Sequence, residues 1–361
     1  MSVVGRRRSC QHDPSRPVAQ WPPHITESWM ETTTTDRKRK ALLVLRIVVS
    51  LAMLGVLFLQ VDDVAFSEVI PPWSAGNGLW LLGAATLTFV GIGVSAARWH
   101  QVLAALGVHA RWRHLFSHYL AGQFVSNVLP TTIGGDVLRV SRLSRETGLG
   151  PSTFASVVLE RLSGWIVLPL ITFSGLALNP GLRGLGRAST VATAIALVTL
   201  VGLMGVVIFV ADKRLLGRFT SSEGWQRFVG AVHLGVDGMR RRPTDAMAVL
   251  AVGIGYQLVL VLAALMAAQA LHIPQVGLTA LLVFMPAVLI IQVLPIGISG
   301  LGLREGAFVL FLKPLGVPAE KAIALGLLLY LLNLVTSLPG AGAFALGNRR
   351  RAGAPGGQVP R

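Results

Sequence analysis

The chain has 361 residues, of which 53% are apolar and only 13% are charged, and its formal net charge is +16. A soluble domain carries about 25% charged residues, so this composition excludes an ordinary water-soluble fold. The basic residues lie in short blocks at the ends of apolar runs, where they act as topology signals and contacts for anionic lipid rather than for nucleic acid. There is no zinc-type Cys/His motif and no phosphate-binding loop, so we expect no metal and no cofactor.

The two ends of the chain differ from the apolar middle. Residues 1–36 are rich in Pro, Ser, Thr and Arg without hydrophobic periodicity, which predicts a disordered cytoplasmic leader. No apolar core follows Arg6–Arg8 within that stretch, so we do not expect a signal peptide. Met30 is an alternative start to Met1. Residues 347–361 are predicted to form a disordered cytoplasmic tail.

Six apolar runs are long enough to cross a hydrocarbon core, which needs about 20 helical residues. They lack the period-2 alternation of an outer-membrane barrel, so we expect α-helices. The six predicted spans are residues 41–61, 79–97, 151–176, 189–211, 246–271 and 322–346.

The orientation follows from the charged residues between the runs. The basic block at 37–40 precedes the first run, which places the N-terminus in the cytoplasm. The loop at 62–78 has acidic residues but no Lys or Arg, so it lies outside, and Arg98 ends the second run on the inside. Arg349–Arg351 follow the last run. We therefore predict a multi-pass protein of the cytoplasmic membrane with both termini inside.

Two further apolar stretches break instead of spanning. Residues 115–129 are interrupted at Pro130–Gly135, and three cytoplasmic-type arginines (139, 142 and 145) follow. A re-entrant hairpin keeps those arginines inside. Residues 277–321 have to begin and end outside, so they form a second hairpin, broken at Pro295–Gly302. The predicted fold is all-α and polytopic, with six full spans and two re-entrant broken hairpins.

The two breaks resemble each other in sequence. The segment from Asn127 to Arg139 aligns without gaps to that from Gln292 to Arg304, with seven identities in thirteen positions. Each half of the chain holds two spans, a hairpin and one span, in opposite orientations. This predicts an inverted repeat, the layout in which many secondary transporters bring broken helices together near the midplane. The alternative is chance recurrence of Pro-x4-Gly in a Gly-rich chain. The predicted transmembrane domain covers 37–346, with half one at 37–176 and half two at 189–346.

The residue types at the breaks suit an anion site. Proline stops a helix and glycine permits turns that other residues cannot make. Bare backbone at membrane depth is tolerated where it lines a wet cavity, and a returning half-helix points its N–H groups into that cavity. The residues expected to shape the two breaks are Asn127, Pro130, Gly134, Gly135, Gln292, Pro295, Gly300 and Gly302.

Charged residues follow each break. Arg139 and Arg304 lie about one helical turn past it, and a guanidinium matches phosphate geometry. Asp136 and Glu305 are expected either to pair with those arginines or to cap helix N-termini. The alternative for Arg139 is a snorkelling cytoplasmic arginine like Arg142, and the alternative for Arg304 is a structural role.

Glu160 and Arg161 lie about eight residues into a span, where ionisable groups are costly and tend to face an interior or a water path. Adjacent helix positions point about 100° apart, so we expect the two to pair with different partners. His114 and His118 share a helix face, but no nearby carboxylate or cysteine completes a metal site, which favours interfacial histidines.

A family resemblance rests on these motifs together: Asn127-x2-Pro130-x3-Gly134-Gly135-Asp136-x2-Arg139, Glu160-Arg161, and Pro295-x-Gly297-Ile-Ser-Gly300-Leu-Gly302-Leu-Arg304-Glu305. Across roughly residues 40–346 the chain resembles the lysylphosphatidylglycerol synthase transmembrane, or flippase-like, family. That family includes the membrane half of multiple-peptide-resistance factors, which flip aminoacylated phosphatidylglycerol, and stand-alone bacterial and archaeal membrane proteins. Those factors add a soluble domain that transfers lysine from tRNA. This chain ends soon after Arg351, so we do not expect a synthase.

The resemblance and the repeat together predict a lipid flippase or transporter, not an enzyme, that moves a phosphate-bearing headgroup. The expected partners are the bilayer and an anionic phospholipid or polyprenyl-phosphate-linked lipid. One alternative is an intramembrane enzyme acting on a lipid-linked phosphate or sugar, with Asp136, Glu160 and Glu305 as its acid or base candidates. Another is a membrane anchor for a partner that binds residues 212–245. Lipid identity, direction, coupling ion and homo-oligomerisation stay open.

Overall fold

The computed structural model describes residues 74–128, 134–211, 229–230, 232–233, 235, 242–294 and 300–352, together with Val48 and Gly55. Every longer regular element in these ranges is a helix, and all of them belong to the unit that runs from Leu45 to Arg361. The elements are α4 (Ala75–Ala105), α5 (Trp112–Val128), α6 (Gly134–Thr147), α7 (Gly150–Leu178), the 3-10 helix η1 (Pro180–Gly184), α8 (Arg187–Ala211), α11 (Pro243–Ala270), α12 (Leu278–Gln292), α13 (Leu303–Leu312), the 3-10 helix η2 (Lys313–Leu315), α14 (Ala319–Ser337) and α15 (Pro339–Ala352).

Among the described residues, five helices are long and apolar enough to cross a membrane: α4, α7, α8, α11 and α14. The first four coincide with predicted spans and α14 covers the first part of the span predicted at 322–346, which confirms a polytopic helical membrane protein. The predicted span at 41–61 lies outside the described residues except for Val48 and Gly55, and so does the predicted leader at 1–36.

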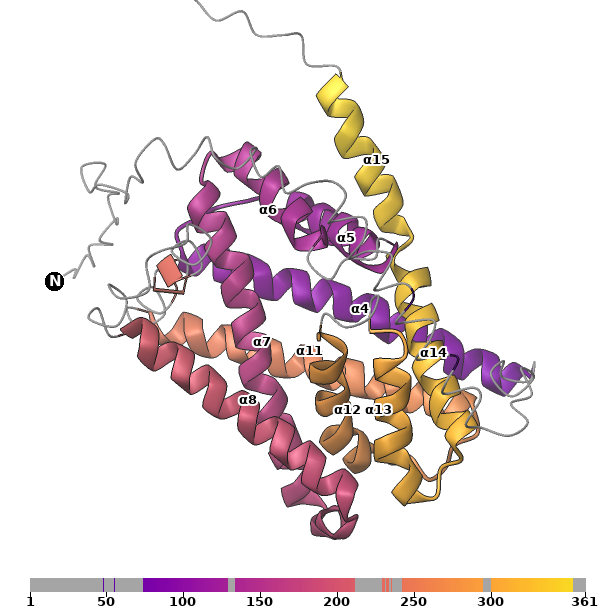
Figure 1. Cartoon of the computed structure of the whole chain (residues 1–361). Coiled ribbons are helices and arrows are strands. Elements are labelled where there is room, and N and C mark those ends of the chain that lie inside the picture. The colour runs from indigo at the N-terminus through magenta and orange to yellow at the C-terminus, as the bar shows by residue number, and fades with distance from the viewer. Residues whose placement is uncertain are drawn as a thin grey trace, which may run out of the picture. The chain divides into compact units, whose positions relative to one another are not determined.

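The long helices α4 and α11 pack along one another (Figure 1). The two helices meet at ordinary packing distance near Gly91, where an added Cβ would lie 3.6 Å from Leu260 and 3.7 Å from Tyr256. α7 contacts α4, α6, α8, α11 and α12. Of the first broken pair, formed by α5 and α6, α6 therefore packs on α7, while α5 packs on α4, α14 and α15.

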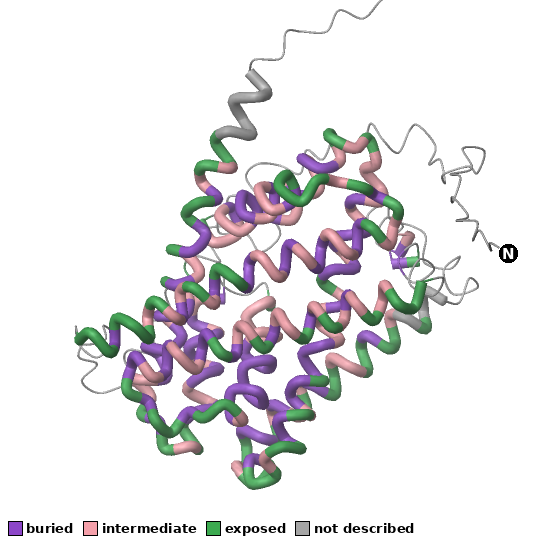
Figure 2. The backbone as a smooth tube through the Cα atoms, turned by 180° about the vertical axis from the view of Figure 1, so that it is seen from behind, coloured by how far each residue is buried: buried purple, intermediate pink, exposed green. Residues whose placement is uncertain are grey.

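Buried residues concentrate where helices pack on each other, while exposed residues follow the outer sides of the long helices (Figure 2). On α8 the exposed side includes large apolar side chains such as Leu197, Val198 and Val201. An exposed apolar side of a spanning helix is suited to contact with lipid chains.

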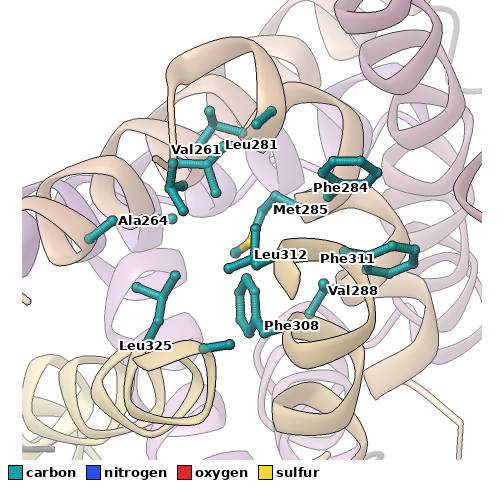
Figure 3. Close-up of a cluster of buried hydrophobic side chains, with 14 of the residues drawn as sticks. Val261, Ala264, Leu281, Phe284, Met285, Val288, Phe308, Phe311, Leu312 and Leu325 are labelled. Atoms are coloured by element: carbon teal, nitrogen blue, oxygen red, sulfur yellow. The ribbon is translucent and has the colours of Figure 1, made fainter. Parts of the chain in front are cut away.

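The largest apolar core lies between α11, α12, α13 and α14 (Figure 3). Phe284 of α12 and Phe311 of α13 stack with ring centroids 5.3 Å apart, and Phe308 and Leu325 are also fully buried there. Stacked aromatic rings stabilise a core beyond the contribution of the apolar area that they bury. This core holds the second broken pair, α12 and α13, against its neighbours.

Both predicted breaks occur. α5 ends at Val128 and α6 begins at Gly134, and the two helices pack against each other. α12 ends at Gln292, α13 begins at Leu303, and these two helices also pack together. Pro130 and Pro295, predicted to cause the breaks, lie outside the described residues.

The predicted span at 322–346 is wrong as a single helix. α14 ends at Ser337 and α15 begins at Pro339. Proline has no N–H to donate and its ring clashes with the carbonyl four residues back, which favours a helix boundary at Pro339. α15 continues to Ala352, past the start of the tail that we predicted to be disordered from residue 347.

Candidate functional site

The two helices of the first broken pair are in close contact at Gly122 and Gly135. A Cβ added to Gly135 of α6 would lie 2.1 Å from the carbonyl oxygen of Gly122 in α5 and 2.2 Å from Oγ of Ser126. Real side chains never approach that closely, so only glycine permits this contact. The contact sets α6 directly against α5 and brings Asp136, the next residue, to the same helix junction.

The second break depends on backbone conformations that favour glycine. Gly300 and Gly302 have φ of +74° and +84°. The Glu305 carboxylate then accepts from the Gly302 N–H at 2.6 Å through Oε2 and from Arg304 Nη2 at 2.8 Å through Oε1. Of the two roles predicted for Glu305, pairing with the arginine and capping the helix, the structure shows both.

Asp136 and Glu160 are joined through Arg139. Arg139 Nη1 donates to Glu160 Oε2 at 2.8 Å, and its Nη2 donates to Asp136 Oδ1 at 2.6 Å. The other Asp136 oxygen accepts from Arg161. The prediction that Glu160 and Arg161 have different partners is therefore confirmed.

A third arginine belongs to the same network, and the sequence analysis placed it wrongly. Arg98 was expected at the cytoplasmic end of a span, but α4 continues to Ala105 and buries it. Its Nη2 donates to Glu160 Oε1 at 3.3 Å. Tyr119 donates to the same oxygen at 3.1 Å, and Ser95 does so at 3.3 Å. Burial of Arg98 is tolerated because Glu160 compensates its charge.

Aromatic rings complete the surroundings of Arg139. Its guanidinium lies over Tyr119, 4.4 Å from the ring centroid, and over Trp99 at 5.1 Å. Trp99 is fully buried and donates from Nε1 to Ser156 Oγ at 2.9 Å. A cation over an aromatic face is stabilised by the ring quadrupole. Trp99 is thus part of the protein interior.

Among the described residues, the network formed by Arg98, Arg139, Arg161, Asp136 and Glu160 joins three arginines to two carboxylates. Its most exposed arginine side chain is that of Arg161, at 44%, and a cationic group that is open to a cavity attracts an anion. The network is therefore suited to a bound anion.

Two adjoining cavities lie at this network. The first, which we call the charged cavity, has a volume of about 260 Å³ and is lined by all five network residues. The second, of about 240 Å³, we call the amide cavity because its lining includes the four amide side chains of Gln123, Asn127, Gln292 and Asn333. Both cavities share Gln123, Ser126, Arg161, Tyr256 and Gln292. The ends of α5 and α12, where the two breaks begin, thus line the same space.

The predicted site residues divide into three sets. Those lining one or both cavities are Asn127, Gly135, Asp136, Arg139, Glu160, Arg161, Gln292 and Arg304. Those in the described segments that line neither cavity are Gly134, Gly300, Gly302 and Glu305. Pro130 and Pro295 lie outside the described residues.

The three predicted arginines differ in how far a ligand can reach them. The side chains of Arg139 and Arg304 are each 7% exposed and each is held by a carboxylate, whereas the side chain of Arg161 is 44% exposed. Arg161 also lines both cavities. It is therefore the arginine best placed to meet an incoming anion, a rank that we had given to Arg139 and Arg304.

The amide cavity connects the first broken pair to α14. Asn127 Nδ2 donates to the carbonyl oxygen of Asn333 at 3.1 Å, and the Tyr330 hydroxyl donates to the Asn127 carbonyl oxygen at 3.1 Å. The Arg304 guanidinium lies over the Tyr330 ring, 5.2 Å from its centroid. Tyr330 and Asn333 lie inside an apolar run whose pattern gave no sign of a site.

Two further predictions near the first pair need correction. Arg142, compared above with a snorkelling arginine, is buried and donates to the carbonyl oxygens of Ala343 and Phe344 in α15. A carboxylate does lie beside the two histidines, since Glu146 contacts His118 at 2.9 Å and His114 at 3.6 Å. The α5–α6 packing brings Glu146 there from 28 residues away.

Comparison with known proteins gives two findings. The chain is 24% identical over 356 residues to the glycosyltransferase AglD of Haloferax volcanii, an alignment that covers 88% of this chain and 57% of the relative. The chain thus spans little more than half the length of that curated relative. The model of the lysylphosphatidylglycerol synthase TM region family matches residues 43–340. The chain therefore belongs to the lysylphosphatidylglycerol synthase TM region family and is a multi-pass membrane protein.

Proposed function

We propose that this protein is a lipid transporter that moves the phosphate-bearing headgroup of an anionic lipid across the cytoplasmic membrane. The observation that carries the proposal is the convergence of charged and amide side chains from both broken pairs on two adjoining cavities. Non-helical breaks at membrane depth are tolerated where they are buried in protein or line a water-filled cavity, as in transporters. The headgroup would enter this space while its hydrocarbon chains stay in the bilayer.

The charge of the site supports an anionic headgroup. Among the described residues, the network joins three arginines to only two carboxylates. Arg161 is the most exposed of its arginines and lines both cavities. A guanidinium can form two parallel hydrogen bonds to a phosphate, so Arg161 is our candidate for the first contact with the headgroup.

The ion pairs suggest how a headgroup could be coupled to movement. Asp136 is shared between Arg139, on its own helix α6, and Arg161, on α7. A phosphate that binds Arg161 would compete with Asp136 and weaken the link between α6 and α7. In our proposal, this exchange of partners allows the first broken pair to shift against α7 as the headgroup passes.

The state of the carboxylates favours transport over acid–base catalysis. Glu160 and Glu305 have side chains that are 3% and 0% exposed, and each accepts hydrogen bonds from arginine. Asp136 is held by two arginines. A general base has to reach the proton that it removes, and carboxylates that are buried and occupied by arginines are poorly placed to do so.

The test is headgroup translocation in proteoliposomes with a fluorescent phosphatidylglycerol, and a fluorescent phosphatidylcholine as the zwitterionic comparison. Arg161→Gln should reduce phosphatidylglycerol transport about tenfold, since a charge-assisted hydrogen bond is worth roughly 1.5–3 kcal/mol. Arg183→Gln, at an exposed position in η1, is the matched control and should transport normally. Equal translocation in protein-containing and empty vesicles, with several anionic lipids, would contradict the proposal.

A second candidate is an enzyme that acts on a lipid-linked phosphate or sugar. The observation that favours it is the similarity to a protein named glycosyltransferase AglD. Purified protein would be incubated with polyprenyl phosphate and radiolabelled nucleotide sugars, and lipid-linked product would be extracted. Product formation that disappears in Asp136→Asn, without translocation by the wild type, would place this candidate ahead of the transporter.

A further inference from the structure

Two buried hydrogen-bond donors at the charged cavity have no partner among the described residues. They are Nε of Arg98, on α4, and Nε2 of Gln257, on α11. Gln257 is only 3% exposed, and Arg98 is 6% exposed. A buried donor without an acceptor is unfavourable, and such groups are rare in folded proteins. Neither residue belongs to a broken pair, and neither was singled out by the sequence motifs.

The protein makes room for the Arg98 guanidinium. A Cβ added to Gly164 of α7 would lie 3.0 Å from its Nη1, and one added to Gly253 of α11 would lie 3.7 Å from the same atom. Gly253 and Gln257 are four residues apart on α11, so they lie on the same helix face. The guanidinium is held in place by Glu160, which accepts from Nη2, and by the ring of Tyr256 at 5.3 Å.

The geometry points to a subsite for an oxyanion, and we propose that Arg98 and Gln257 bind the phosphate group of the lipid headgroup. A phosphate accepts several hydrogen bonds and brings negative charge to a network in which three arginines contact two carboxylates. Both residues line the charged cavity, Arg98 from α4 and Gln257 from α11. This inference rests on the proposed function, because it names the residues that would hold the transported headgroup.

The subsite is tested by binding rather than by transport. The full chain in detergent micelles is titrated with dioctanoylphosphatidylglycerol, and dioctanoylglycerol serves as the uncharged probe. Gln257→Leu, which removes the donor, should weaken phosphatidylglycerol binding about fivefold to tenfold. Gln257→Glu, which adds a negative charge, should weaken it further. Dioctanoylglycerol should show no dependence on residue 257.

The matched control is Gln101→Leu. Gln101 lies on α4, as Arg98 does, and its buried Oε1 has no partner in the described part of the chain, but it lines neither cavity. The Gln101→Leu variant should bind the probe like the wild type. Thermal denaturation of each variant checks that the protein is folded. Competition by inorganic phosphate would show that the subsite recognises the phosphate group itself, and the absence of competition would show that it needs the intact lipid headgroup.

The outcomes separate the subsite from the proposed function. Normal probe binding by folded Gln257→Leu and Gln257→Glu would overturn the subsite even if the wild type transports lipid. If binding depends on Gln257 but the wild type moves no lipid in proteoliposomes, the subsite is supported and the proposed transport function is contradicted. Lack of saturable binding to the wild type would overturn the subsite.

Discussion

Arg139 and Glu160 connect the first broken pair to a membrane-spanning helix. Arg139 Nη1, on α6, donates to Glu160 Oε2, on α7, at 2.8 Å, and both side chains are almost completely buried. Glu160 also accepts from Arg98 on α4 and Tyr119 on α5. One carboxylate thus joins four helices, so its charge should matter for stability before it matters for any ligand.

We predict that Glu160→Gln destabilises the protein by about 3–5 kcal/mol, because it leaves two buried arginines without their shared counter-charge. The free energy of unfolding would be measured by SDS titration in mixed micelles. Glu320→Gln, near the start of α14 and outside the network, is the control and should change little. A Glu160→Gln variant as stable as the control would contradict this account of the network.

The contact between Gly122 and Gly135 predicts a strong steric effect. Gly135→Ala places a methyl group 2.1 Å from the Gly122 carbonyl oxygen, so α5 and α6 have to separate. We expect a loss of about 3 kcal/mol, the upper end for overpacking. The control is Gly255→Ala within α11, where an added Cβ meets no atom within 4 Å. That variant should be neutral or about 1 kcal/mol more stable, since alanine favours a helix. Equal stability of the two variants would argue against the close contact.

Arg142 fixes α15 to α6 through two hydrogen bonds, to the carbonyl oxygens of Ala343 at 3.1 Å and Phe344 at 3.0 Å. Lysine keeps the charge but lacks the planar fork that reaches both oxygens. We predict that Arg142→Lys raises amide hydrogen exchange about tenfold in α15, because local opening becomes easier. Arg145→Lys changes an exposed arginine on the same helix and should leave that exchange unchanged. Unchanged exchange in both variants would mean that the two bonds do not hold α15.

Much of the helical layout could be predicted from the sequence, because the bilayer imposes a length and a hydrophobicity on each span. α4, α7, α8 and α11 coincide with predicted runs, and both breaks lie where the Pro and Gly pattern predicts them. The separate partners of Glu160 and Arg161 followed from helix geometry alone. The re-entrant course of the hairpins and the inverted repeat remain predictions.

The site itself could be predicted only in part, because tertiary packing decides which polar residues meet. Arg98 looked like a topology signal, since its position at the end of an apolar run does not reveal the carboxylate that compensates it. Tyr330 and Asn333 lie in a run that reads as lipid-spanning, and only the packing of α14 brings them to Asn127. The contact of Glu146 with the two histidines was missed for the same reason, because it depends on the packing of α6 against α5. Such contacts depend on helices distant in sequence, and local patterns do not encode them.

The buried ion pair of Arg304 and Glu305 predicts how much stability is lost when one or both of its members are replaced. Arg304 Nη2 lies 2.8 Å from Glu305 Oε1, and the two side chains are buried. Removing one partner leaves an uncompensated buried charge, so Arg304→Met and Glu305→Met should each destabilise the protein by about 3–5 kcal/mol. The double variant leaves no charge behind, and apolar side chains of similar volume can replace a buried pair at little cost.

A double-mutant cycle measured by SDS titration tests this. The double variant should lose less stability than the sum of the single variants, by a coupling energy of about 1–3 kcal/mol. Some loss should remain even in the double variant, because Glu305 also accepts from the Gly302 N–H at 2.6 Å and methionine cannot do so. Additive losses would mean that each residue acts through other neighbours. In that case the second break would be stabilised by its glycine conformations and the apolar core around Phe308 and Phe311, and not by the ion pair.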